Sequence, residues 1–296
     1  MKKRFASFFL CFVLIAALLP ISASADMGPK PSVRIEFENM GTDLCYGTLL
    51  SKARSTGPAS AWDGKSGYYH WGYGEEGEPI WQAFIDYEDP DGYYFLQEWW
   101  ECSENGQLNW TYYPPQSFKI LLYYPATDTY AVSDIYERYA FDSYFTADLS
   151  EVDVLNPSAV QHISVEKSYD HSAEIISLIC RIIITILVEL GIALLFKLRG
   201  KNLIKLVALT NIATQVILNV LLYAANYSRG QFFFVFIYVI LEIFVFVIEA
   251  VIYTFCFKKL SDGKITKKKS VAYAFAANLV SFIAGLAIAK LIPGIF

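Results

Sequence analysis

The sequence predicts an all-β, sandwich-like extracytoplasmic domain followed by an α-helical membrane domain of four spans. Three observations favour this fold class: a secretory signal, a first half of short strand-like runs, and four long apolar segments in the second half. All six tryptophans lie before residue 173. Residues 26–172 hold 24 acidic and 8 basic side chains, whereas residues 173–296 hold 5 and 13. The chain therefore divides into an acidic part and a basic part.

Residues 1–25 have the features of a secretory signal peptide. The basic start Lys2-Lys3-Arg4 precedes an apolar run, and Ala23-Ser24-Ala25 matches a small-x-small cleavage site. We expect the mature chain to begin at Asp26. An uncleaved membrane anchor is the alternative, and it is disfavoured because the apolar run is short for a span.

Residues 26–150 read as short strands separated by turn residues, which is typical of a β-sandwich. The predicted strands are SVRIEF, LCYGTLL, IWQAFIDY, YYFLQEWWE, FKILLYY and TYAVSDIY. Residues 151–173 are polar, and we interpret them as a stalk that leads into the first membrane helix.

Two cysteines, Cys45 and Cys102, remain in the outer domain after cleavage, each on a predicted strand. A disulfide between them would stabilise an exported domain by roughly 4 kcal/mol in the chain-entropy model. The equally weighted alternative is a pair of buried, unbonded thiols.

The acidic segment YEDPDGYYFLQE invites comparison with a calcium-binding loop. Asp89, Asp91 and Gly92 occupy positions 3, 5 and 6 of an EF-hand loop counted from Tyr87. Tyr87 itself is the wrong residue for position 1, and Pro-Asp-Gly is ordinary turn chemistry. We favour the turn, and we expect no metal site and no cofactor.

Tryptophan and tyrosine are concentrated in residues 93–113. Trp99, Trp100 and Trp110 are therefore candidates for a ligand platform that stacks on cell-wall glycans or peptides. Strand alternation places Trp99 and Trp100 on opposite faces. The alternative, which we favour, is that these aromatic side chains fill the core of a small domain.

The second half, residues 174–296, contains four apolar segments of about the length that crosses a bilayer. They span about 175–196, 203–224, 231–257 and 271–292. The loops after the first and third segments are rich in lysine and arginine, which predicts that both are cytoplasmic. Residues 26–172 would then lie outside, which agrees with the signal peptide. The predicted location is therefore the cell membrane, with several spans and an extracytoplasmic N-terminal domain.

Polar residues recur on one face of each membrane segment. At 1.5 Å per residue, Glu189, Asn211, Glu249 and Asn278 all lie roughly 12–15 Å from the cytoplasmic charges. We predict that they form one buried layer, with Glu189 matched to Asn211. Carboxylate and amide oxygens suit a proton or a hard cation. The alternative is that they only hold the helices together, which explains the amides better than the glutamates.

A second layer is predicted roughly 21–27 Å from the same end. Arg181 is expected to form a structural pair with Glu242 there, beside Asn219. A buried charge is costly without a partner, so this pairing would explain why both residues lie within apolar segments.

The sequence contains none of the common hydrolase signatures, and we nominate no catalytic residue. We therefore lean away from an enzyme. The hypothesis that we favour is a surface binding, sensing or interaction module anchored by the four-helix bundle. The alternative is a proton- or cation-coupled transport component that uses the intramembrane glutamates and asparagines, in which case four helices would need a homo-oligomer. The bilayer is the expected partner. Nucleic acid is not, because the basic runs lack interleaved aromatic residues.

Several segments of the chain resemble known bacterial sequences. In the membrane half these are TILVELGIALLF, NIATQVILN, LEIFVFVIEAVIY and ANLVSFIAGLA, which resemble uncharacterised bacterial membrane proteins. The opening ADMGPKPSVRIEF, with YGTLLS and YERYAF, resembles secreted and then anchored proteins of clostridia-like Gram-positive bacteria. The resemblance implies the same two-part architecture and implies no activity.

Overall fold

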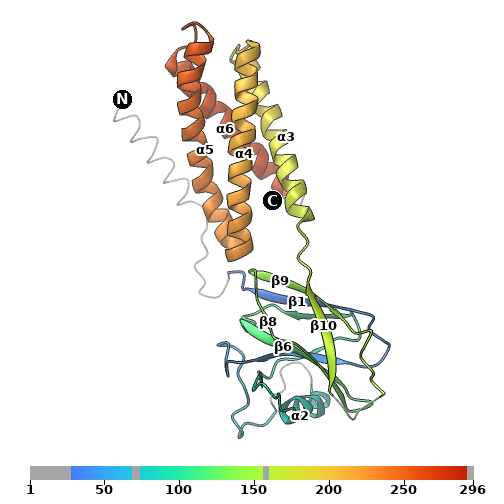
Figure 1. The fold of residues 1–296 in the computed structure, drawn as a ribbon. Helices are drawn as coiled ribbons and strands as arrows, with labels where there is room; N and C mark the ends of the chain where they lie inside the picture. Colours follow the sequence, from blue (N-terminus) through green and yellow to red (C-terminus); the bar gives the residue numbers. More distant parts are fainter. Residues whose placement is uncertain (1–27, 69–73, 156–159, 292–296) are drawn as a thin grey trace.

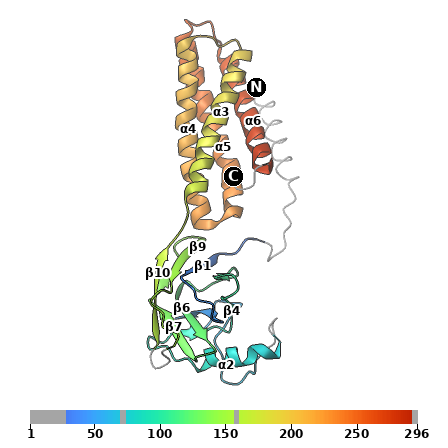
Figure 2. The ribbon, with the colours of Figure 1, turned by 90° about the vertical axis from the view of Figure 1, so that its right-hand side faces the viewer.

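The computed structural model describes residues 28–68, 74–155 and 160–291. A β-rich domain comes first, and a bundle of four long helices stands on one end of it (Figure 1). The view turned by 90° shows the same stacking of the two parts (Figure 2). The predicted signal peptide, residues 1–25, lies outside the described residues.

The β-rich domain is built on one curled sheet, a half-barrel, and not on the two facing sheets of a sandwich. Its strands are β1 (Ser32–Glu38), β2 (Tyr46–Ser51), β3 (Tyr94–Phe95), β4 (Trp100–Glu101), β5 (Gln107–Trp110), β6 (Ser117–Tyr124), β7 (Thr129–Ser133), β8 (Tyr136–Glu137), β9 (Asp142–Asp148) and β10 (Gln161–Lys167). The order across the sheet is β3-β2-β6-β7-β10-β9-β1-β5, with β4 beside β2 and β8 beside β6.

Strand β10 is the reason that the sheet is continuous. Residues 161–163 pair in parallel with β7, and residues 164–167 pair antiparallel with β9. One strand therefore joins what would otherwise be two separate sheets. This finding also corrects the predicted stalk over residues 151–173, because β10 lies within it. Ile163 and Val165 alternate with polar neighbours and are buried, as a half-buried strand requires.

The inner face of the curled sheet encloses the main core of the domain. In β1, the buried residues Val33, Ile35 and Phe37 alternate with exposed ones. A second, smaller core lies on the other face, where Trp81 and Phe84 of a helix pack against Leu50 and Leu121 of the sheet. The sheet therefore carries apolar side chains on both faces, and they fill two cores.

The segment IWQAFIDY, predicted as a strand, is instead the helix α2 (Glu78–Asp86), which follows the short 3-10 helix η1 (Glu75–Gly77). Its buried residues Ile80, Trp81 and Phe84 share one helical face. Proline in the first turn favours a helix start, because its fixed backbone angle suits that position. Bulky apolar residues alone suggested a strand, and the Gly-Glu-Pro start was the better signal.

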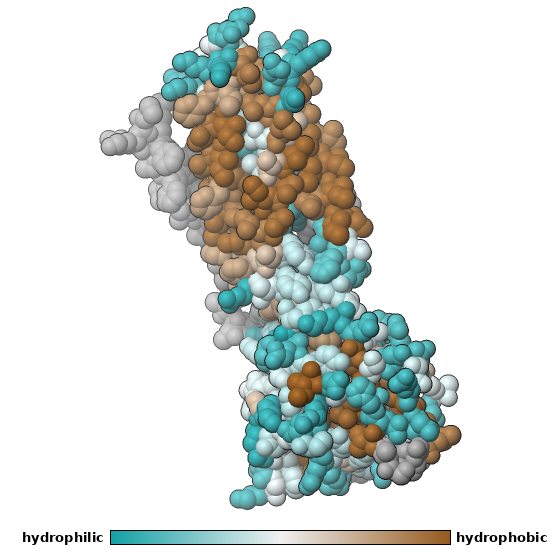
Figure 3. Space-filling view, viewed as in Figure 1, coloured by the Kyte–Doolittle hydropathy of each residue, from teal (hydrophilic) through white to brown (hydrophobic). Residues whose placement is uncertain are grey.

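The helices of the bundle are α3 (Ser172–Leu195), α4 (Lys201–Arg229), α5 (Gln231–Leu260) and α6 (Lys267–Leu291). Each packs against the next, and α6 packs against α3, so the four close into a ring. Hydrophobic residues cover most of the face of the bundle seen in Figure 3, and hydrophilic residues gather at the end far from the β domain.

Three helices, α3, α4 and α5, are long and apolar enough to cross a membrane. Helix α6 has 25 residues, yet it begins with three lysines and its middle is rich in alanine. Of the four predicted spans, the structure thus supports three by length and composition, and the fourth stays a prediction.

The β domain contacts the turn between α4 and α5. The backbone N–H of Phe141, in the loop before β9, donates a hydrogen bond of 2.8 Å to the carbonyl of Tyr227. The Phe141 ring lies against Gly230, the single residue between the two helices. Tyr227 also contacts the rings of Tyr139 and Tyr169. The two parts of the chain therefore meet through packed aromatic side chains.

Candidate functional site

The four residues of the predicted inner layer come together in the middle of the bundle. Helices α3, α4, α5 and α6 contribute Glu189, Asn211, Glu249 and Asn278, in that order. The two glutamates are 1% and 0% exposed, and both amides are buried. The structure thus brings together every member of the layer that helical spacing predicted.

Hydrogen bonds from three polar side chains hold the two carboxyl groups. Asn211 Nδ2 donates to Glu189 Oε2 at 2.6 Å, which is the match expected from sequence. Asn278 Nδ2 donates to Glu249 Oε2 at 2.7 Å, and Thr214 Oγ1 donates to Glu249 Oε1 at 2.8 Å. Each carboxyl group is therefore tied to at least one neighbouring helix.

The same amides also bond to their own helices, which fixes their orientation. Asn211 Nδ2 donates to the carbonyl of Val207 at 3.0 Å, and Asn278 Nδ2 donates to that of Ala274 at 3.0 Å. Only the nitrogen of an amide can donate to a carbonyl, so the amide oxygens must face elsewhere. In Asn211 that oxygen is buried and receives no hydrogen bond from any described residue.

Two tyrosines complete the layer. The hydroxyl of Tyr253 accepts a hydrogen bond of 3.2 Å from Asn211 Nδ2. The hydroxyl of Tyr273 lies 3.2 Å from the backbone carbonyl of Glu189 and 3.4 Å from Glu189 Oε2. Neither tyrosine was among the residues predicted for the layer. Tyr253 follows Glu249 by four residues, about one helical turn, so helical spacing could have found it. Tyr273 precedes Asn278 by five residues, which fits the helical spacing less well.

The two carboxyl groups, finally, are held side by side by one helix. Asn211 binds Glu189 and Thr214 binds Glu249, and these two residues lie three positions apart on α4. Neither glutamate forms an ion pair with any lysine, arginine or histidine in the described part of the chain. Two neighbouring carboxylates repel each other strongly in a water-poor interior, because their charges are hardly screened. A proton held within the pair would relieve that repulsion.

The predicted structural pair, Arg181 and Glu242, lies nearer to the β domain. Both line one cavity together with Tyr238. The guanidinium carbon of Arg181 is 5.7 Å from the centre of the Tyr238 ring. Asn219 does not join them, because its Nδ2 donates to the backbone carbonyl of Gln215 on its own helix at 2.8 Å.

The candidate ligand platform is not formed. Trp99 is 3% exposed and packs in the core under α2, whereas Trp110 is 2% exposed and packs in the inner core. Trp100 packs against the inner core and lies 5.2 Å, ring to ring, from Trp110. Trp99 and Trp100 do lie on opposite faces of the sheet, as alternation predicted. All three stabilise the domain instead of presenting a surface to a ligand.

Cys45 and Cys102 are not bonded in this structure, so the disulfide is not the one of the two equally weighted alternatives that is formed. Their backbones are directly opposite, since the N–H of Cys102 donates to the carbonyl of Cys45 at 2.9 Å. Both side chains are buried. Burial raises the pKa of the Cys45 thiol to about 12. The alternative of two buried thiols is therefore the one observed.

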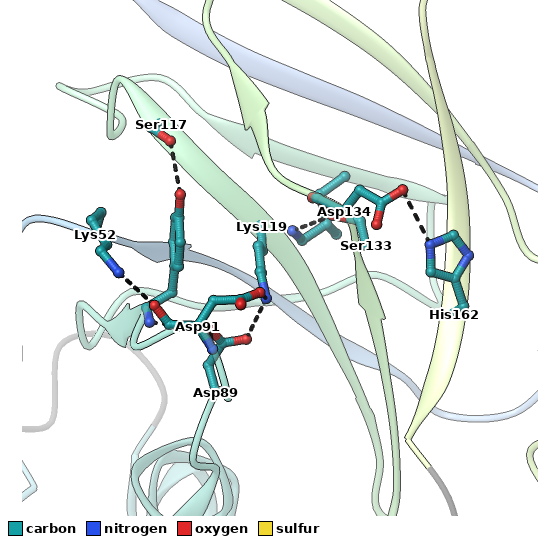
Figure 4. A network of polar contacts seen from close by, with 10 residues as sticks. Lys52, Asp89, Asp91, Ser117, Lys119, Ser133, Asp134 and His162 are labelled. Carbon is teal, nitrogen blue, oxygen red and sulfur yellow. Dashed lines mark hydrogen bonds and ion pairs between the residues drawn. The ribbon is translucent and has the colours of Figure 1, made fainter.

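The acidic segment at residues 87–98 is a turn, and a lysine occupies the place of a cation (Figure 4). Asp89 Oδ2 accepts hydrogen bonds from the backbone N–H groups of Asp91 and Tyr93. Lys119 Nζ lies 2.8 Å from Asp89 and 2.5 Å from Asp91. The hydrogen bond from Lys119, and then its charge, lower the pKa of Asp91. The described residues hold no cluster of three or more histidine, cysteine or acidic side chains able to bind a metal.

Comparisons with known proteins add no relative to this picture: no family of proteins, no curated protein and no solved structure matches the chain.

Proposed function

We propose that this chain is an integral membrane protein that handles protons, as a component of proton-coupled transport, at the Glu189–Glu249 carboxyl pair. One observation supports this function above the others. Two buried carboxyl groups lie side by side, bound by residues three positions apart on α4, and the described residues around them offer hydrogen-bond donors and no compensating positive charge. A proton shared between them is the charge that this arrangement lacks.

The cost of the pair argues against a purely structural role. A charged side chain at the centre of a bilayer costs roughly 2.5–3.5 kcal/mol on insertion scales, whereas an amide could bond the same neighbours without that cost. Interhelical hydrogen bonds between neutral groups contribute about 0.6–2 kcal/mol each. An amide at either glutamate position could accept the hydrogen bonds that Asn211, Asn278 and Thr214 donate. The two glutamates therefore add something that packing does not need.

A proton fits the site better than a metal cation does. A hard cation such as Ca²⁺ takes six to eight oxygen ligands. Here Glu189 Oε2 and both oxygens of Glu249 already accept hydrogen bonds. Of the side-chain oxygens discussed above, only Asn211 Oδ1 is both buried and without a donor. One oxygen without a donor is enough for a proton or a bound water. A metal cation needs several oxygen ligands, so its shell would be incomplete here.

The proposed topology places the β domain outside the cytoplasm and the basic loops inside. It is supported by the lysines and arginines in the α3–α4 and α5–α6 connections, at the bundle end far from the β domain. In this topology α6 is the fourth span. Four helices leave little room for a solute path, so a transported solute would need a second copy of the chain. The surface-binding hypothesis loses its main support because Trp99 and Trp110 are buried and Trp100 packs against the inner core.

Proton flux into liposomes tests the proposed function. Purified protein is reconstituted with a pH-sensitive dye inside the vesicles, and a potassium diffusion potential drives protons inward. Glu249→Gln keeps an oxygen for Thr214 and cannot share a proton as a carboxyl pair does. We expect it to lower the flux by at least about tenfold, the effect of roughly 1.4 kcal/mol on a barrier.

The matched control is Glu174→Gln, the same change in the first turn of α3. Glu174 bonds the Tyr169 hydroxyl at 2.7 Å and lies away from the pair. We expect its flux to equal that of the unmodified protein. If Glu249→Gln also left the flux unchanged while the protein remained folded, the pair would be structural and the proposed function wrong.

A further inference from the structure

A cavity lies beside the carboxyl pair, on the side that faces the β domain. Polar side chains from all four helices line it, among them Arg181, Gln215, Glu242, Asn278 and Ser281. The space open to the centre of a water molecule is about 20 Å³. About 10–15 Å³ by this measure holds one water molecule. The cavity is therefore large enough for water and too small for an organic solute.

One residue connects the cavity to the pair. Asn278 lines the cavity, and its Nδ2 lies 2.7 Å from Glu249 Oε2. Ser281, one turn further along α6, also lines the cavity, and its hydroxyl is buried with no hydrogen-bond partner among the described residues. A buried hydroxyl without a partner is unfavourable. Water in the cavity would satisfy it.

The opposite side of the pair is closed by aromatic rings. Tyr253, Phe257 and Tyr273 are all fully buried. Their ring centres are 4.9–5.7 Å apart, which leaves no gap between them. Phe257 follows Glu249 by eight residues, roughly 12 Å toward the lysine-rich end of α5. The pair thus has a polar cavity on one side and a packed aromatic cluster on the other.

We propose that the cavity is a water-filled step of a one-sided proton path that joins the Glu189–Glu249 pair to Glu242, while the Tyr253–Phe257–Tyr273 cluster closes the path toward the basic loops. This inference rests on the proposed function and gives its site a direction of access. A pair that holds two protons releases one to the cavity water and keeps the other, and the water passes a proton to the Glu242 carboxylate. Arg181 lines the same cavity, and its positive charge favours that carboxylate and opposes the entry of metal cations.

The path can be tested without measuring transport. The carbonyl stretch of a protonated carboxyl group shifts to lower frequency when its proton exchanges for deuterium. Infrared spectra of the membrane-embedded protein, recorded after transfer to D2O, therefore report how fast the pair exchanges, and Glu249→Gln assigns the band. Ser281→Val fills the cavity with apolar atoms. We expect it to slow the exchange by at least about tenfold.

Two further variants keep the test informative. Ile283→Phe adds bulk on the same helix at a side chain that is 56% exposed on the outside of the bundle, and it should leave the exchange unchanged. Thr185→Val removes one cavity hydroxyl with almost no change in volume, so it should slow the exchange even if Ser281→Val fails to fold. Unchanged exchange in whichever of the two cavity variants folds would overturn the path.

The outcomes also separate this inference from the proposed function. Slower exchange in Ser281→Val, together with unchanged proton flux in Glu249→Gln, would leave the path standing and remove the transport role. Unchanged exchange in Ser281→Val, together with lost flux in Glu249→Gln, would overturn the path and leave the proposed transport role standing.

Discussion

Gly230 offers a sharp test of how the two parts of the chain are joined. It is the only residue between α4 and α5, and its backbone angles are φ 79° and ψ 176°. This region of backbone space is essentially restricted to glycine. A Cβ atom added there would lie 2.6 Å from two ring carbons of Phe141. Gly230→Ala therefore meets two independent penalties.

The expected loss of stability follows from those two penalties. Strained backbone of this kind costs about 1–3 kcal/mol. Moving the Phe141 ring out of a packed junction costs a further 1–3 kcal/mol or so, the usual range for overpacking. We therefore expect Gly230→Ala to lower the free energy of unfolding by about 2–6 kcal/mol. Most of the second part should return when Phe141→Ala is added, since alanine leaves space for the new methyl group.

Gly191→Ala is the matched control. Gly191 lies within α3, and a Cβ atom there would have no heavy atom within 4 Å. Alanine is favoured over glycine inside a helix by about 0.5–1 kcal/mol, so this variant should be slightly more stable. Thermal unfolding of the purified protein in detergent, followed by tryptophan emission and by helical circular dichroism, measures all four proteins. An unfolding temperature of Gly230→Ala that equals or exceeds that of the unmodified protein would refute the junction described here. A cost that Phe141→Ala fails to relieve would refute the ring clash.

Two other predictions concern the β domain. Lys119→Ala should destabilise it by about 3 kcal/mol, because the fully buried Asp89 carboxylate would lose its partner. Lys52→Ala removes an exposed lysine and should cost less than about 1 kcal/mol. Chemical denaturation measures the stability of both variants, and equal losses would contradict this prediction. Cys45 and Cys102 should resist alkylation at pH 8 in the folded protein and react once it is unfolded. Burial raises the pKa of the Cys45 thiol to about 12 and so keeps it protonated. Peptide mass spectrometry measures the labelling of each cysteine, and rapid labelling of the folded protein would contradict the prediction.

The polar layer was predictable because a helix has a fixed rise and a fixed turn. Counting from the basic loops placed Glu189, Asn211, Glu249 and Asn278 at one height, and the antiparallel direction of neighbouring helices matched Glu189 with Asn211. No long-range information was needed beyond the order of the helices. The spacing could not predict that the two glutamates lie side by side, because their separation depends on how the helices are rotated and packed.

The β domain was harder to predict for a physical reason. Strand pairing is non-local, and a sequence fixes which face of a strand is apolar without fixing its neighbours. β10 is the clearest case: two buried residues in a polar segment looked like part of a stalk, yet they join β7 to β9 across the sheet. The helix α2 was missed because its apolar residues were read by type and not by their spacing.

The junction and the carboxyl site are linked by the same two helices. The turn at Gly230 ends α4 and begins α5, and these helices supply Asn211 and Glu249 to the inner layer. A flexible stalk would have left the β domain free to move independently. Phe141 prevents this in two ways: its ring lies against Gly230, and its backbone N–H donates a hydrogen bond to the carbonyl of Tyr227. Helices are stiff along their axes, so a displacement of the loop before β9 must shift α4 and α5 together or break those contacts. The two halves could thus move apart only by breaking the contacts at this junction, which lies at the ends of the helices that hold the site.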